Sequence, residues 1–153
     1  MSSLDALDAR IMLLFAQEPR VGVLEASRRL GVARGTVQAR LDRLEATGVI
    51  TGWSPTLDPA ALGFPVSAFA TLEITQAGGH QPVAEHLRQI PEVLEAHTIT
   101  GTADLIVRLV ARSNADLQRV IDQVVGSPRV VRASTVIVLA TEIAPRVTTL
   151  LSV

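Results

Sequence analysis

The residues best suited to bind a charged partner lie between positions 28 and 43. Five arginines and a single acid give this stretch a local net charge of +4. They are Arg28, Arg29, Arg34, Arg40, Arg43 and Asp42. Helical spacing places Val37, Leu41 and Leu44 on one face, which must be buried. The opposite face carries small residues, and such a face flanked by arginines can lie in a DNA major groove.

The pattern around these arginines is typical of a helix-turn-helix, with Gly31 and Val32 at the turn. We expect its residues to contact bases or phosphates. The predicted DNA-contacting residues are Ser27, Arg28, Arg34, Gly35, Thr36, Gln38, Ala39 and Arg43. Arg40 lies about 60° from the centre of the buried face, so an ion pair with an acid of a neighbouring helix stays open beside DNA contact. A helical hairpin with a solvated basic face is the alternative for the whole stretch.

A second candidate site is the turn Gly101-Thr102-Ala103-Asp104. Glycine can supply a positive φ, and the exposed backbone N–H groups of such a turn can hold a carboxylate. The carboxylate of Asp104 can hold an ammonium group by a charge-assisted hydrogen bond. The alternative, given equal weight, is a hairpin turn whose aspartate caps its own backbone.

Other chemistries lack the residues they need. Without cysteine there is no disulfide, thiol catalysis or cysteine zinc site. His80, His86 and His97 have no ligand spacing, and we find no catalytic triad, phosphate loop or carboxylate pair. We therefore predict no catalytic residue, no metal, no cofactor and no enzyme activity. The N-terminus lacks the apolar core of a signal peptide, and no apolar run reaches the roughly 20 residues of a membrane span, so we expect a cytoplasmic protein with no membrane partner.

The composition points to assembly. Of the 153 residues, 48% are hydrophobic and only 19% are charged, so we expect apolar surface to be buried in an oligomer. The net charge of −1 gives no overall argument for nucleic acid. Any such argument depends on local clustering.

The elements that position the arginines are three helices, expected at 4–18, 23–30 and 34–46. Asp5 is a plausible cap for the first, with Asp8 three residues later as in a capping box. A short extended segment at 49–53 follows, and Trp53 is expected to anchor the linker rather than stack on a base. We predict a three-helix, winged helix-turn-helix domain at 1–52 and a linker or hinge at 53–65.

The rest of the chain, 66–153, contains a short internal sequence repeat. The pattern P-x-V-x4-T occurs at Pro91 and again at Pro128, each time after an amphipathic helix and before a β-rich run. With strands expected at 66–75 and 104–111, the order is βαββαβ, a ferredoxin-like arrangement. The predicted fold class is therefore α+β.

The predicted strands are apolar on both sides. In 104–111, Leu105, Val107 and Leu109 alternate with Ile106, Arg108 and Val110, and the run 135–143 behaves similarly. Two helices cover only one side of such a sheet. We infer that the open side, including Val110 and Val138, packs on the same sheet of a second subunit.

Several short signatures along the chain together resemble the Lrp/AsnC family of leucine- and asparagine-responsive transcription regulators. They are Leu4-Asp5-x-x-Asp8-x-x-Ile11, Arg40-x-x-Arg43-Leu44-Glu45-x-x-Gly48-Val49-Ile50, Leu57-Asp58-Pro59-x-x-Leu62-Gly63, Pro91-x-Val93, Thr100-Gly101-x-x-Asp104-Leu105, and Thr135 leading the last strand. The resemblance implies double-stranded DNA binding by the N-terminal part. It also implies a C-terminal domain that forms dimers, then tetramers or octamers, and binds small molecules, commonly amino acids, between subunits.

The chain departs from the family pattern at the motif itself. Ala26-Ser27 replaces the usual Leu-Ala, and Ala33 replaces the usual serine at the cap of the second motif helix. Losing a hydroxyl cap weakens a helix by about 1 kcal/mol, and Gly35 in its first turn weakens it by a similar amount, roughly 0.5–1 kcal/mol.

The resemblance implies an effector, commonly an amino acid, and the turn at 101–104 is the candidate to hold it. The predicted effector-site residues are Thr100, Gly101, Thr102, Ala103, Asp104, Ser134 and Thr135. We predict a sequence-specific DNA-binding transcriptional regulator whose assembly or DNA affinity responds to this effector. The alternative is a small-molecule-binding or enzymatic ferredoxin-like oligomer that carries a vestigial helical domain.

Overall fold

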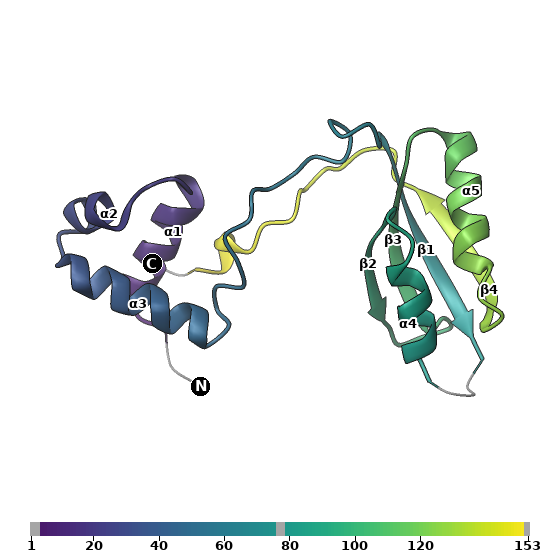
Figure 1. The fold of residues 1–153 in the computed structure, drawn as a ribbon, viewed down its shortest axis with the longest axis horizontal. Coiled ribbons are helices and arrows are strands. Elements are labelled where there is room, and N and C mark those ends of the chain that lie inside the picture. Colours follow the sequence, from purple (N-terminus) through teal and green to yellow (C-terminus); the bar gives the residue numbers. More distant parts are fainter. Residues whose placement is uncertain (1–3, 76–78, 152–153) are drawn as a thin grey trace. The chain divides into compact units, whose positions relative to one another are not determined.

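The computed structural model describes residues 4–75 and 79–151, and the chain forms two compact units (Figure 1). The helical unit comprises the chain up to Pro55 and from Ile143 onward, and the sheet unit comprises Thr56–Glu142. The prediction placed everything after position 65 in one domain. The structure differs for the last segment, because the 3-10 helix η1 (Thr148–Leu150) contacts α1 (Ala6–Gln17).

Three helices stand where the sequence predicts them: α1, α2 (Val23–Leu30) and α3 (Arg34–Ala46). The predicted capping box of α1 is confirmed. The Asp8 N–H donates to Asp5 Oδ1 at 2.9 Å, and the Asp5 N–H donates to Asp8 Oδ2 at 3.0 Å. Gly31 ends α2 with a φ of +70°, a left-handed conformation that glycine adopts without strain and that starts the turn into α3.

Apolar side chains from all three helices close the core of the helical unit. Its buried members are Ile11, Phe15, Ala26, Val37 and Leu41. Trp53 covers the edge of this core. Its ring makes an edge-on contact with Phe15, with centroids 5.5 Å apart, and its indole N–H donates to Glu45 Oε1 at 2.8 Å. The expected anchoring role of Trp53 is therefore confirmed, although the segment 49–53 pairs with no described strand.

The sheet unit has the predicted βαββαβ order. Its elements are β1 (Val66–Ile74), α4 (Gln81–Arg88), β2 (Val93–Thr98), β3 (Leu105–Ala111), α5 (Asn114–Val125) and β4 (Val130–Ile137). The four strands are antiparallel in the order β2-β3-β1-β4. Both helices lie on one side of the sheet (Figure 1). The core between the sheet and its two helices contains alternate strand residues such as Leu72, Val107 and Leu109.

The last strand is shorter than predicted. β4 ends at Ile137, which pairs with Ala68, and the Val138 N–H donates to the Ser67 carbonyl at 2.8 Å. Ser67 is the second residue of β1, so beyond Val138 only Val66 of the partner strand remains, and Pro65 before it carries no N–H. Leu139, expected within the strand, is 98% exposed.

The other side of the sheet, which we call the helix-free face, mixes apolar and polar residues. It carries Phe69, Thr71, Ile106, Arg108, Ser134 and Val136. Phe69 is 37% exposed and Val136 is 63% exposed. The expectation that Val110 lies open on this face is wrong, since it is 4% exposed. Together with Leu57 and Phe64 of its own unit, Val110 lines a small apolar pocket instead.

Candidate nucleic-acid interface and effector site

The exposed side of α3 is the candidate nucleic-acid surface. Val37, Leu41 and Leu44 are 0%, 4% and 1% exposed, so the predicted buried face is confirmed. The opposite side is exposed and small at its N-terminal end, where Gly35 is followed by Thr36 and Ala39. The cap residue, Ala33, makes no side-chain hydrogen bond to the helix, as its apolar side chain dictates.

Four of the five arginines lie within ion-pair distance of an acid in the helical unit. Arg29 contacts Glu18 at 2.5 Å and Glu25 at 3.0 Å. Arg28 is more open, with a side chain 69% exposed and 3.8 Å from Glu25. Arg34 is exposed, and no ion pair involving it is seen in the described part of the chain. The sequence count of +4 therefore overstates the charge that α2 and α3 present to a partner.

Asp8 is the centre of a buried ion-pair network. It is 0% exposed, and its carboxylate accepts from Arg43 Nη2 at 2.6 Å and Arg40 Nη1 at 3.0 Å. Arg40 also pairs with Asp5. Burial raises the pKa of Asp8, but hydrogen bonds from Arg43, the Asp5 backbone and Arg40 outweigh it and lower the pKa to about 2. The network thus ties the start of α1 to the middle of α3.

This network bears on two sequence expectations. The ion pair between Arg40 and an acid of a neighbouring helix is confirmed. Arg43, expected on the exposed side toward DNA, directs its guanidinium onto buried Asp8 instead, and its contact with DNA stays a prediction. Helical spacing placed Arg43 on a shoulder of α3, and a long side chain on a shoulder can reach either way.

Ser27 also differs from its predicted role. It is 5% exposed, and its hydroxyl donates to the Leu24 carbonyl at 2.8 Å within α2. The remaining predicted DNA-contacting residues are exposed: Arg28, Arg34, Gly35, Thr36, Gln38 and Ala39. Gln38 Nε2 additionally donates to Asp42 Oδ1 at 2.7 Å.

The predicted effector turn connects β2 to β3. Gly101 is exposed and has a φ of +121°, which L side chains rarely adopt. The Ile99 N–H donates to the Asp104 carbonyl at 3.0 Å and closes the turn. Asp104 Oδ2 accepts from the Ile74 N–H at 2.8 Å, where the β1–β4 pairing shifts register. The carboxylate therefore caps the backbone of a neighbouring strand. This role is close to the alternative interpretation, in which Asp104 caps the backbone of its own turn.

The structure does not bring the two parts of the predicted effector set together within one chain. Ser134 and Thr135 lie on β4, which β1 separates from β3. They also point to opposite sides of the sheet, because Ser134 pairs with Thr71 and Thr135 pairs with buried Ala70.

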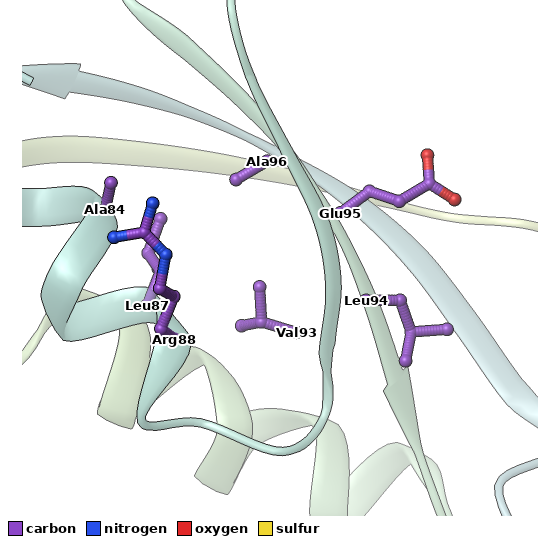
Figure 2. Close-up of a pocket in the computed structure, with 7 residues that line it drawn as sticks. All are labelled: Ala84, Leu87, Arg88, Val93, Leu94, Glu95 and Ala96. Atoms are coloured by element: carbon purple, nitrogen blue, oxygen red, sulfur yellow. The ribbon is translucent and has the colours of Figure 1, made fainter. Parts of the chain in front are cut away.

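A separate pocket of about 210 Å³ lies between α4 and β2 (Figure 2). Its floor is apolar, with Leu87, Val93 and Ala96, and the guanidinium of Arg88 stands over it. Glu95 points away from the pocket and pairs with Arg108 at 2.9 Å on the helix-free face. No residue of the predicted effector set lines this pocket.

Residues 4–75 and 79–151 also bear on other classes of site. These residues hold no group of three or more metal-ligating side chains. Their helices are all too short or too polar to cross a membrane.

Comparison with known proteins gives the class of protein. Residues 4–51 match the winged helix-turn-helix DNA-binding family, and residues 67–147 match the Lrp/AsnC ligand binding domain. A helix-turn-helix joined to such a domain defines a DNA-binding regulator with a small-molecule module. The chain belongs to the Lrp/AsnC family of transcriptional regulators, as the resemblance predicted.

Individual relatives agree along most of the chain. The HTH-type transcriptional regulator FL11 of Pyrococcus horikoshii is 30% identical over 138 residues, which cover 90% of this chain and 91% of that protein. The regulatory protein AsnC of Haemophilus influenzae is 26% identical and covers 79% of this chain and 81% of its own. The structure of E. coli AsnC has a TM-score of 0.87 at 26% identity, covering 95% of this chain and 99% of that one. The Pyrococcus and Haemophilus relatives are both named as regulatory proteins.

Proposed function

We propose that this regulator reads DNA through the N-terminal half of α3. The surface consists of Arg34, Gly35, Thr36, Gln38 and Ala39, with Arg28 beside it. The observation that carries the proposal is Arg34, the one arginine of positions 28–43 for which the described residues show no ion pair, at the exposed start of a helix buried by its other side. N-terminal residues of a recognition helix are those that reach base edges in the major groove.

A gel-shift experiment tests this proposal. The probe is the DNA upstream of the protein's own gene, at two salt concentrations, with no amino acid added. Arg34→Ala should weaken binding, by about 1–3 kcal/mol if Arg34 contacts a guanine edge, or should flatten the salt dependence by about one phosphate if it contacts the backbone. Arg88→Ala, in the sheet unit, removes the same charge as a control. Equal losses in both variants would refute the assignment.

The protein acts as a homo-oligomer in this proposal, with a second copy covering the helix-free face. Support comes from Phe69 and Val136, which are apolar yet exposed in the single chain. The high apolar fraction of 48% agrees with such burial. Further assembly to a tetramer or octamer follows the family pattern.

The effector is an amino acid in this proposal, held at the turn 100–104 with Ser134 and Thr135 supplied by another subunit. The exposed turn with its positive φ can hold the carboxylate of such a ligand. The carboxylate of Asp104 can hold its ammonium group. A similar chain of 24% identity and TM-score 0.84, a regulator from Neisseria meningitidis covering 95% of this chain and 96% of its own, was solved with L-methionine. At that identity it supports only the shared fold.

The effector proposal is tested by a thermal-shift screen of amino acids followed by calorimetry. A ligand that binds only the native state raises the melting temperature. Because Asp104 also caps the Ile74 N–H, the useful variant is Asp104→Asn, which keeps an acceptor and removes the charge. It should lose amino-acid binding. If Asp104→Asn binds normally while Arg88→Ala does not, the effector occupies the pocket of Figure 2 instead.

A further inference from the structure

Gln38 and Asp42 form a hydrogen-bonded pair one turn apart on the exposed side of α3. Gln38 Nε2 lies 2.7 Å from Asp42 Oδ1. An ionised carboxylate can only accept hydrogen bonds, so the amide atom facing it must be the nitrogen. Asp42 therefore fixes which way round the Gln38 amide is held, and the amide oxygen is directed away from the carboxylate.

The groups left on this amide define what it can recognise. A glutamine amide has two N–H donors and one carbonyl oxygen. With one donor bound to Asp42, one N–H and Oε1 remain. Adenine presents a matching pair in the major groove, an N7 acceptor beside an N6–H donor. Guanine presents two acceptors, N7 and O6, so a carbonyl oxygen held in this orientation would face another oxygen.

We propose that Gln38 reads an A·T base pair in the major groove and that Asp42 is a positioning residue that holds its amide in the adenine-reading orientation. The inference rests on the proposed docking of α3 and adds the base it selects. It also explains why an acid stands on a surface meant for DNA. The charge of Asp42 weakens attraction to phosphates but excludes the amide orientation that would accept guanine.

The chain offers matched controls on its other helices. On α5, Gln118 Nε2 donates to Asp122 Oδ1 at 2.9 Å, the same residue types at the same spacing. A role limited to helix stability predicts similar effects at both pairs. On α4, Gln81 Nε2 donates to Glu85 Oε1 at 3.2 Å, so glutamate also holds a glutamine four residues earlier. Asp42→Glu is therefore the conservative variant that should restore the function.

The experiment is selection from a pool of random double-stranded DNA with the full chain. Wild type should enrich an A·T pair at one position of each half-site. Gln38→Ala should lose the preference at that position alone, by about 5- to 150-fold. Asp42→Ala should admit guanine there, and Asp42→Glu should restore adenine. Asp122→Ala should enrich the wild-type sequence.

Three outcomes would overturn the inference. An unchanged sequence from Gln38→Ala removes the base contact, and an unchanged sequence from Asp42→Ala, or the same change from Asp122→Ala, removes the positioning role. Failure of the underlying docking looks different. In that case wild type enriches no sequence, or Arg34→Ala selects the wild-type sequence with undiminished affinity, and the inference falls with it.

Discussion

Replacing Asp8 with asparagine should destabilise the helical unit and loosen α3. Asp8 is fully buried and accepts hydrogen bonds from Arg43 at 2.6 Å, from Arg40 at 3.0 Å and from the Asp5 N–H at 3.0 Å. Asparagine keeps nearly the same shape but cannot balance two guanidinium groups. The substitution therefore tests the charge of Asp8 and leaves the packing nearly unchanged.

The expected loss follows from the pKa of Asp8. Burial raises this pKa, but the hydrogen bonds from Arg43, the Asp5 backbone and Arg40 lower it from 3.8 to about 2. One pKa unit corresponds to about 1.4 kcal/mol, so the charge contributes about 2 kcal/mol to the free energy of unfolding at neutral pH. The full penalty for a broken buried pair, about 3–5 kcal/mol, should not be reached, because Arg40 and Arg43 are 30% and 37% exposed.

The same shift sets the pH dependence. The folded pKa lies below the unfolded one, so the contribution is complete above about pH 4 and is lost as the pH falls toward 2. Asp8→Asn should therefore be less stable than wild type at neutral pH and should approach it in acid.

Urea titration followed by tryptophan fluorescence measures the free energy of unfolding of the helical unit. The chain has a single tryptophan, Trp53, and it contacts Phe15 and Glu45 of the helical unit. Asp5→Asn is the control, since asparagine caps a helix as well as aspartate and a solvent-exposed ion pair such as that of Asp5 with Arg40 contributes little to stability. If Asp8→Asn unfolds at the same urea concentration as Asp5→Asn, the buried network does not stabilise the unit as argued.

Two further predictions concern assembly and the start of α3. Val136→Glu should dissociate the proposed dimer, since an unpaired buried charge costs several kcal/mol. Val125→Glu, on the exposed side of α5, should leave the dimer intact. Light scattering that finds a monomeric wild type, or no difference between the variants, would contradict this prediction. Ala33→Ser should stabilise the helical unit by about 1 kcal/mol by supplying the missing side-chain cap of α3. The urea transition followed by Trp53 fluorescence should shift to higher urea. An unchanged midpoint would show that the first N–H groups of α3 already have other partners.

The elements were predictable because their signals are local. Periodicity fixed the buried face of α3 through Val37, Leu41 and Leu44, and the turn at Gly31 followed from residue type. The βαββαβ order followed from the repeated pattern at Pro91 and Pro128. The periodicity of α3, the turn at Gly31 and each single copy of the repeated pattern are local features of the sequence.

The features that the sequence did not predict depend on distant residues. β4 ends at Ile137, whose partner Ala68 lies close to the start of β1 and far from β4 in the sequence. Val110 alternates correctly for the helix-free face, yet it is 4% exposed and lines a pocket together with Leu57 and Phe64. Nothing within the strand sequences encodes either event.

The arginines show why the charge of a motif must be counted in space. Arg29 is paired with Glu18, and Arg40 and Arg43 with Asp8, so acids from α1 and its C-cap neutralise part of the cluster on α2 and α3. Arg34, which is exposed, and Arg28, which is 69% exposed with a 3.8 Å contact to Glu25, are the cations of this cluster that can meet phosphate in the proposed complex. Two arginines release few counterions, so a single chain gains little non-specific affinity. In the proposed complex, tight binding requires base contacts from α3 and several copies of α3 acting on one DNA, because linking the copies makes each later binding event intramolecular, at a high effective concentration. The proposed pairing through the helix-free face and the proposed recognition surface are thereby coupled: without a second copy of the chain, the proposed DNA-binding surface carries too little charge to bind DNA tightly.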